Sequence, residues 1–247
     1  MFDIVISIVT YNSDINLLKN LILQIKNEKK LNLAVFILDN LSDRQYFDDL
    51  LDLDCKVVSS GKNLGYGSGH NLINKITYKS KYFLIINPDI SLENNTILNC
   101  FDFLEKNKEY VAITPTLKLN NELYFKNEKR NFSITEMFLR RFTSDKTLGN
   151  FSNYVIKNKV FDCTHMSGAF MLIRRENFSY LNGFDEKFFM YFEDIDLSIR
   201  LKKNGKIGKL DYVFAYHKRS RASYKDIKMF IIHLLSYIKF KFKSYKN

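Results

Sequence analysis

Residues 3–12 read DIVISIVTYN, an apolar run from Ile4 to Val9 that ends in polar positions. Apolar residues then recur with the spacing of one helix face, at Leu17, Leu18, Leu21, Ile22 and Ile25. A short apolar run followed by an amphipathic helix is the first half of a β-α-β unit. We therefore predict a strand over residues 4–9, a loop at residues 10–12 and a helix after it.

The same alternation continues along the chain. Further strands are predicted at residues 33–38, 56–59, 82–86, 111–114, 168–173 and 212–216, and helices at residues 175–181 and 193–203 as well as through Ile73, Ile97 and Leu104. This pattern predicts an α/β fold with a mostly parallel central sheet and helices on both faces. Ligands of such sheets bind beyond the carboxyl ends of the strands, where this chain has Asp39 and Asn87-Pro88-Asp89.

Composition predicts one folded domain. The 247 residues are 46% hydrophobic, which suffices for one sizeable core, and only 2 Pro and 9 Gly argue against disordered linkers. Cys55, Cys100 and Cys163 are an odd, widely spaced set without a CxxC motif, which favours reduced thiols in an intracellular compartment. The start, Met1-Phe2-Asp3, lacks the basic residues of a signal peptide.

The positive charge is concentrated in the tail. Of the net +11, residues 217–247 carry +8, because nine Lys and Arg face Asp226 alone, and the rest of the chain carries +3. The apolar run 229–235 is far too short to span a membrane, and large apolar residues beside lysines suit a helix in the interface of an anionic membrane. Alternatively, this helix packs Ile231, Leu234, Leu235 and Ile238 on its own domain and leaves the lysines in solvent.

A high positive charge is also typical of proteins that bind nucleic acids. We expect no nucleic-acid partner, because the chain before the tail is only weakly basic and its aromatic residues cluster beside acids, which repel phosphate. A salt titration with DNA distinguishes the two readings.

A glycine-rich loop precedes the second helix. Gly65, Gly67 and Gly69 occupy alternate positions between Asn63 and Asn71. Such a loop lets the backbone approach a ligand, and the helix N-terminus that follows favours anions. The spacing is not that of the dinucleotide fingerprint, and by itself the loop is equally consistent with a tight turn.

Asn87-Pro88-Asp89 follows an apolar strand and offers an amide and a carboxylate in a loop fixed by proline. Mg²⁺ and Mn²⁺ take oxygen ligands from one or two carboxylates plus substrate phosphates, so Asp89 is a candidate ligand. His217, at the end of the last predicted strand, is a second candidate. An ordinary turn and a structural histidine are the alternatives.

Three carboxylates crowd a helix start at Glu193-Asp194-Ile195-Asp196, directly after the aromatic run Phe188–Phe192. The helix dipole favours acids there, and Asp196 can pair with Arg200, which explains part of the cluster. An aromatic wall beside a carboxylate also suits a sugar cleft with a general base. Since successive helix positions turn by about 100°, the three acids cannot share one role, and Asp196 is the structural candidate.

Together these motifs resemble the inverting glycosyltransferases of family 2, which have the GT-A fold, and particularly their bacterial rhamnosyltransferase-like branch. The resemblance covers about residues 3–223 and rests on Ser7–Asn12, Asp39–Ser42, Asn63–Asn71, Asn87–Asp89, Ser167–Ala169 with Ile173–Arg175, Gly183–Leu197 with Arg200, and His217.

The resemblance implies a role for each site residue. Thr10, Tyr11 and Asn12 resemble the loop that holds the nucleotide base, and Asp39 the acid that binds the pyrimidine. The nucleotide-sugar and its diphosphate would be bordered by Asn63, Gly65, Tyr66, Gly67, Gly69, Asn71 and Asn87. Asp89 matches the last acid of the DxD-type metal motif, with Asn87 where the first Asp often stands, and His217 matches a histidine that completes the metal shell. Asp194 matches the catalytic base, and Gly168, Met190, Tyr191 and Glu193 would contact the acceptor.

The resemblance further implies an enzyme dependent on Mg²⁺ or Mn²⁺ that moves L-rhamnose from dTDP-rhamnose onto a lipid-linked saccharide of a bacterial surface polysaccharide, such as O-antigen or capsule. It would be cytoplasmic and peripheral on the inner face of the membrane. Residues 1–115 would bind the donor and residues 116–222 the acceptor. Within the second part, residues 117–165 would determine which acceptor is recognised. Residues 223–247 would form the basic amphipathic helix. The alternatives are a UDP-hexose or UDP-galactofuranose transferase and a non-catalytic sugar-binding module.

Overall fold

A computed structural model describes residues 1–42, 50, 52–77, 79–119, 123–124, 159–218 and 227–243. Most of the segment 117–165, which we expect to determine the choice of acceptor, lies outside the described residues.

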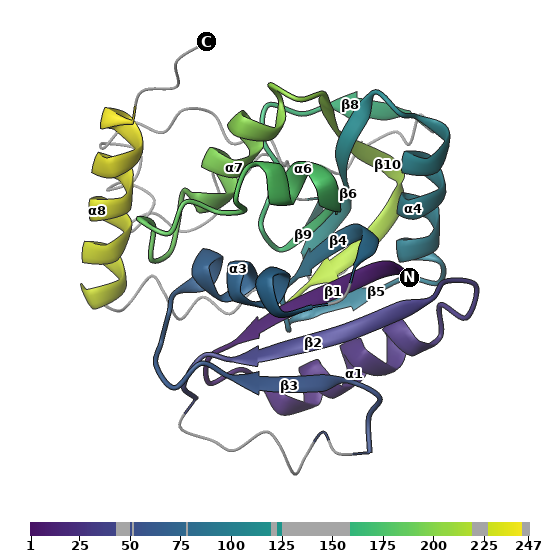
Figure 1. Ribbon diagram of the computed structural model, residues 1–247, viewed down its shortest axis with the longest axis horizontal. Coiled ribbons are helices and arrows are strands. Elements are labelled where there is room, and N and C mark those ends of the chain that lie inside the picture. Colours follow the sequence, from purple (N-terminus) through teal and green to yellow (C-terminus); the bar gives the residue numbers. More distant parts are fainter. Residues whose placement is uncertain are drawn as a thin grey trace.

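The described strands form one ten-stranded sheet in the order β3-β2-β1-β4-β9-β6-β10-β5, with β7 beside β6 and β8 beside β10. Figure 1 shows β1, β2 and β3 side by side at one end of this sheet. They are β1 (Phe2–Thr10), β2 (Leu33–Asp39), β3 (Lys56–Ser59), β4 (Ser80–Ile86), β5 (Ile90–Leu92), β6 (Tyr110–Leu119), β7 (Leu123–Tyr124), β8 (Val160–Asp162), β9 (Phe170–Arg174) and β10 (Lys206–His217).

The parallel part of the sheet is the one that the sequence predicts. β1 pairs in parallel with β2 and β4, β2 pairs in parallel with β3, and β10 pairs in parallel with β6. β9 runs antiparallel between β4 and β6, and β5 and β8 are short antiparallel strands that the sequence did not predict. The expected α/β class with a mostly parallel central sheet is confirmed.

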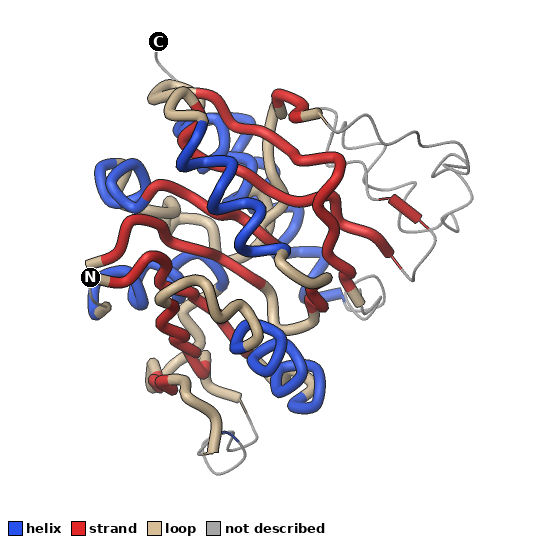
Figure 2. Tube along the Cα trace, turned by 90° about the vertical axis from the view of Figure 1, so that its right-hand side faces the viewer, coloured by secondary structure: helices blue, strands red, loops and turns tan. Residues whose placement is uncertain are grey.

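Two hydrophobic cores, one on each face of the sheet, follow from the alternation of side chains along the strands. In β1, Ile4, Ile6 and Ile8 are buried with α1 and α4, whereas Val5 and Val9 point to the opposite face with α3, α6 and α7. The helices on both sides of the strands (Figure 2) are α1 (Ile15–Lys26), α3 (Tyr66–Ile76), α4 (Thr96–Lys106), α6 (Arg175–Tyr180) and α7 (Glu193–Leu201). Both faces of the sheet are thereby covered, which leaves its carboxyl edge for ligands.

The C-terminal helix α8 (Ile227–Phe242) stands at the edge of the molecule (Figure 1). The alternative that it packs Ile231, Leu234, Leu235 and Ile238 on its own domain is contradicted for three of them, because Ile231, Leu235 and Ile238 are 50%, 51% and 41% exposed, whereas Leu234 is partly buried. The helix instead contacts the domain through Tyr237 and Phe240. Within the described chain, no helix combines the length and the apolar character that a membrane span requires.

Candidate active site

The carboxyl ends of β1 and β2 meet at Thr10 and Asp39, which are direct partners in the parallel ladder. Thr10 is buried and its hydroxyl donates to the carbonyl oxygen of Leu38 at 3.2 Å, so its side chain holds the strands together. Tyr11, the next residue, is 53% exposed. Of this loop, the Tyr11 ring is therefore the surface available to a planar ligand.

The loop after Asp39 is ordered by its carboxylate. Oδ1 of Asp39 accepts the backbone N–H of Ser42 at 3.0 Å, and the Ser42 hydroxyl accepts the backbone N–H of Asn12 at 3.0 Å. Asn12 has a positive φ of 50°, a conformation that Asn tolerates better than most residues. The structure thus brings Asn12 and Asp39 together, as the sequence predicts.

Asn40 connects this edge to the glycine-rich loop. Its Nδ2 donates to Oδ1 of Asn63 at 2.9 Å and to the carbonyl oxygen of Gly65 at 3.2 Å, and its Oδ1 accepts the backbone N–H of Leu64 at 2.7 Å. The sequence motifs gave no role to this buried residue. Its place directly after Asp39 at a strand end was the available signal.

Gly65 touches the aromatic segment that precedes α7. Its φ is +84°, and a Cβ built there would lie 2.3 Å from the carbonyl oxygen of Phe189. The same carbonyl oxygen accepts the backbone N–H of Tyr66 at 2.9 Å. Only glycine permits this contact, because any side chain would displace the Phe189 backbone.

The other glycines and Asn71 face the protein interior. A Cβ at Gly67 would meet Phe184 at 2.7 Å, and one at Gly69 would meet Val9 and Leu38 at 2.9 Å. The buried Asn71 uses its amide on the Phe184 backbone, donating at 2.9 Å and accepting at 2.8 Å. Gly67, Gly69 and Asn71 therefore have packing roles that need no ligand.

Tyr66 links the two sides of the site. Its hydroxyl lies 2.6 Å from the carbonyl oxygen of Gly168 and 3.0 Å from Oδ1 of Asn87. Burial, with the negative charges of Glu193, Asp194 and Asp89, raises the pKa of Tyr66 well above its ordinary value. The hydroxyl thus stays protonated and acts as a donor at physiological pH.

Asp194 is held by the backbone on both carboxylate oxygens. Its Oδ2 accepts the N–H of Gly168 at 3.1 Å and its Oδ1 accepts the N–H of Ile195 at 2.9 Å. Because a backbone N–H lies at each oxygen, the direction of the carboxylate is fixed by the protein. The Asp194 side chain is 8% exposed, at the first turn of α7.

The segment before Asp194 has an unusual backbone. Tyr191 and Phe192 have positive φ angles of 70° and 67°. Each such conformation of a bulky residue costs on the order of 1–3 kcal/mol, so surrounding contacts must hold it. The Tyr191 ring lies 4.6 Å from that of His233 in α8, and the carbonyl oxygen of Met190 accepts the Ser236 hydroxyl at 2.7 Å.

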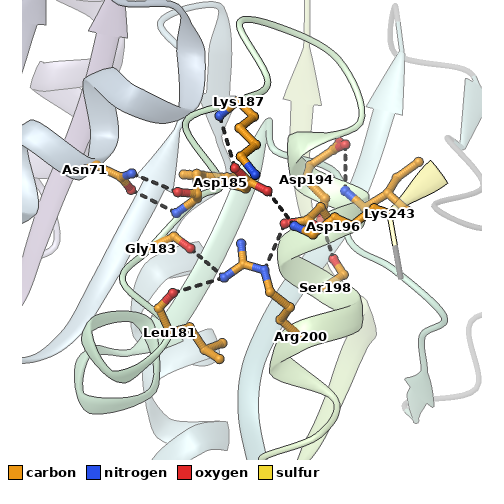
Figure 3. A network of polar contacts seen from close by, with 12 residues as sticks. Asn71, Leu181, Gly183, Asp185, Lys187, Asp194, Asp196, Ser198, Arg200 and Lys243 are labelled. Carbon is orange, nitrogen blue, oxygen red and sulfur yellow. Dashed lines mark hydrogen bonds and ion pairs between the residues drawn. The ribbon is translucent and has the colours of Figure 1, made fainter. Parts of the chain in front are cut away.

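Asp196 has the structural role that the sequence predicts. It is fully buried, and its Oδ2 accepts from Nε of Arg200 at 2.8 Å. Arg200 also donates to the carbonyl oxygens of Leu181 and Gly183 at 3.1 and 2.8 Å (Figure 3). Lys243 of the C-terminal tail, to which the sequence motifs assigned nothing, reaches Asp196 at 2.5 Å and Asp185 at 2.6 Å.

Asp89, directly before β5, and His217, at the end of the neighbouring strand β10, lie next to each other. Oδ1 of Asp89 lies 3.3 Å from Nε2 of His217, and both side chains are partly accessible, at 26% and 17%. Antiparallel pairing of β5 with β10 produces this contact, since His217 is the register partner of Ile90. A carboxylate oxygen and an imidazole nitrogen side by side form a donor set that suits Mn²⁺ or Mg²⁺.

The rest of such a coordination shell would come from a ligand. Among the residues that the structure describes, no group of three or more His, Cys, Asp and Glu side chains encloses a metal site. Two protein ligands with open positions fit a cation whose remaining ligands are water and substrate phosphate oxygens. Asn87 contributes less to such a site, because its Oδ1 is within hydrogen-bond distance of Tyr66.

Known proteins resemble this chain in sequence. The model of the family described as Glycosyl transferase family 2 matches residues 5–181. Rhamnosyltransferase WbbL of Escherichia coli K12 is 31% identical over 163 residues, which are 62% of this chain and 60% of WbbL. An N-acetylglucosaminyl-diphospho-decaprenol L-rhamnosyltransferase of Mycobacterium tuberculosis is 52% identical over 40 residues, which are 16% of this chain and 13% of that enzyme. The match spans less than two thirds of either relative.

A solved structure shares the fold. The mannosyltransferase PcManGT from Pyrobaculum calidifontis, in complex with GDP-Man and Mn²⁺, superposes with a TM-score of 0.68 at 13% identity and covers 99% of this chain and 65% of its own. The expected GT-A fold is thereby confirmed.

Proposed function

This chain belongs to glycosyl transferase family 2 and is a glycosyltransferase, and we propose that it moves L-rhamnose from dTDP-rhamnose to a lipid-linked saccharide with inversion. One relationship carries the proposal. Tyr66 contacts both Asn87, two residues from Asp89, and Gly168, whose N–H holds Asp194. These contacts connect Asn87, close in sequence to the proposed metal ligand Asp89, with the proposed base Asp194, which supports the proposal.

The chemical step needs a base opposite the leaving group. The acceptor hydroxyl oxygen forms a bond to the anomeric carbon while the bond from that carbon to the diphosphate oxygen breaks. Asp194 takes the proton of the hydroxyl, and the diphosphate leaves with the bonding electron pair. The backbone N–H groups of Gly168 and Ile195 fix the direction of the Asp194 carboxylate before the acceptor arrives, which reduces the entropy lost in reaching the transition state.

Asp89 and His217 are the residues that would hold Mg²⁺ or Mn²⁺. When bound, such a cation neutralises charge that develops on the departing diphosphate. The protonated Tyr66 hydroxyl contacts Asn87 and Gly168 and thereby helps to position both residues near the proposed cation site.

The donor assignment rests on residues at the ends of β1 and β2. The exposed Tyr11 ring suits stacking of a pyrimidine, and Asp39, the ladder partner of the preceding Thr10, suits a hydrogen bond to the base. Rhamnose is proposed because WbbL and the mycobacterial relative are named rhamnosyltransferases.

The acceptor assignment follows the mycobacterial relative, whose name specifies a lipid-linked N-acetylglucosaminyl diphosphate. We extend this to a lipid-linked saccharide of a bacterial surface polysaccharide. An enzyme with such an acceptor works at the inner face of the cytoplasmic membrane, where its lipid substrate is anchored. Gly168, Met190, Tyr191 and Glu193 remain our proposed acceptor residues.

Ligand-dependent thermal stabilisation tests the donor. A ligand that binds only the folded state raises the melting temperature according to its affinity. We expect dTDP and dTDP-rhamnose to raise it in the presence of Mn²⁺ or Mg²⁺, and rhamnose transfer to a lipid-linked N-acetylglucosaminyl diphosphate to follow. Stabilisation by UDP-hexoses or UDP-galactofuranose alone would overturn the rhamnose assignment, and absence of transfer with every donor would overturn the proposed activity.

A further inference from the structure

Helix α8 has two faces with different partners. Its exposed apolar side chains are Ile227, Ile231, Leu235, Ile238 and Phe242, with exposed fractions from 41% to 86%. At about 100° per residue these five positions fall within an arc of about 80°. We call this set the outer stripe.

Lysines flank the outer stripe on both sides. By the same rotation, Lys228 and Lys239 lie about 60° to 80° from its centre on one side, and Lys241 lies about 80° away on the other. All three are exposed, and no acidic residue occurs between residues 227 and 243. An apolar stripe with lysines at both edges matches a helix lying in the interface of an anionic lipid surface. An acidic protein partner would meet the cations but would not require the stripe.

The opposite face of α8 holds the segment that precedes the proposed base. Tyr237 and Phe240 pack on Phe192, with ring centroids 5.6 and 5.4 Å apart, and the Ser236 hydroxyl donates to the carbonyl oxygen of Met190. Lys239, at the edge of the outer stripe rather than on this opposite face, donates to the carbonyl oxygen of Lys187 at 2.8 Å. The positive φ angles of Tyr191 and Phe192 therefore lie directly under this helix.

Lys243, just after the helix, completes the attachment. Its ammonium group lies between the carboxylates of Asp185 and Asp196, and Asp196 is in the same turn of α7 as Asp194 (Figure 3). One helix thus carries an exposed lipid-type face and, on its other side, the contacts that keep a costly backbone conformation beside the base.

We propose that α8 docks on an anionic lipid surface through the outer stripe, and that docking orders residues 187–194 and thereby activates transfer. A membrane-bound helix loses freedom of motion, so the contacts on its inner face are kept a larger fraction of the time. The catalytic segment is then competent where the lipid-linked acceptor is found. The activation rests on the proposed function, whereas the docking and ordering do not.

Vesicle binding tests the docking surface. The full chain is mixed with vesicles of phosphatidylglycerol and phosphatidylcholine, or of phosphatidylcholine alone, and bound protein is measured by flotation. We expect binding to the anionic vesicles, reduced by about tenfold or more in the variant Ile231→Ser with Leu235→Ser. Leu23→Ser, a similarly exposed apolar position in α1, is the matched control and should bind as the wild type. Equal binding of the double variant, or a dimer in light scattering that the double variant abolishes, overturns the proposal.

Hydrogen exchange tests the coupling without requiring activity. Amides of residues 187–194 should exchange more slowly when the wild type is on anionic vesicles, and the double serine variant should show no change. Lys243→Met should still bind vesicles but lose the added protection, and Lys243→Arg should restore it. Unchanged exchange on bound vesicles overturns the coupling. If the proposed activity is wrong, no donor is turned over, yet vesicle binding and added protection remain.

Discussion

The backbone N–H of Gly168 donates to Oδ2 of Asp194 at 3.1 Å, joining two residues that lie 26 positions apart in the sequence. The carbonyl oxygen of the same Gly168 accepts from Tyr66. One residue thus contacts both the proposed base and the residue that reaches Asn87. The arrangement ties the two halves of the proposed reaction to a single short turn before β9.

Asp194→Asn is expected to abolish transfer. The amide cannot take up a proton, although it keeps the shape of the carboxylate and can accept one of the two backbone N–H groups. Stabilisation by dTDP with Mn²⁺ should be close to that of the wild type. Asp102→Asn, at an exposed position of α4, is the control and should keep full activity. Transfer by Asp194→Asn at more than a few per cent of the wild-type rate would exclude Asp194 as the base.

Tyr66→Phe keeps the ring and removes the hydroxyl that lies between Gly168 and Asn87. Loss of this buried hydrogen bond should lower the free energy of unfolding by about 1–3 kcal/mol and reduce kcat by about tenfold through misplacement. Tyr180→Phe, where the side chain is 77% exposed, should change neither quantity. Because the raised pKa keeps Tyr66 protonated, wild-type activity should show no ionisation of this hydroxyl below pH 10. Steady-state kinetics and urea unfolding measure these effects, and full activity in Tyr66→Phe would contradict them.

Asp89→Asn and His217→Gln address the proposed metal ligands. Each should remove most of the additional stabilisation that Mn²⁺ gives in the presence of dTDP, because one of two protein ligands is weakened or repositioned. The stabilisation measured with dTDP and a chelator should stay unchanged. A metal-dependent shift of wild-type size in both variants would place the cation elsewhere.

Gly65→Ala and Gly61→Ala separate backbone strain from close contact. Both glycines have positive φ angles, but a Cβ at Gly61 meets nothing within 4 Å, whereas at Gly65 it meets the Phe189 carbonyl oxygen. Gly61→Ala should cost about 1–2 kcal/mol of unfolding free energy, and Gly65→Ala about 3 kcal/mol or more with lower activity. Equal costs in urea unfolding would show that the Phe189 backbone moves away freely.

We predict that burial of His70 lowers the free energy of unfolding in acid. The imidazole is completely buried, its Nδ1 lies 2.6 Å from the Ser7 hydroxyl, and burial lowers the pKa of His70 to about 3. The unfolded chain takes up a proton on His70 near pH 6.5, whereas the folded chain does not. The contribution of His70 to the free energy of unfolding is therefore fully present above pH 6.5 and falls as the pH decreases toward about 3. Between pH 7 and pH 5 this amounts to about 2 kcal/mol, which the variant His70→Asn should not show. Urea unfolding at both pH values measures the difference, and identical pH slopes would contradict the assignment.

The sequence predicted the elements that local pattern controls. Apolar runs located β1, β2, β3 and β4 to within about two residues, because alternation and short length distinguish a buried strand without knowledge of its neighbours. The structural role of Asp196 with Arg200 was also predictable, since side chains four positions apart on a helix are adjacent. Polar groups at strand ends indicated where the site lies, because parallel strands end at one edge.

The contacts between different helices and strands could not be predicted from local sequence and follow from the tertiary structure. The antiparallel insertion of β9, the contact of Asp89 with His217 across 128 positions, and the inward packing of Gly67, Gly69 and Asn71 depend on strand order and register. The face that α8 turns outward was likewise undetermined, since apolar residues occur all around this helix. Periodicity fixes which residues share a face, whereas the partner of each face is set by packing among segments distant in the sequence.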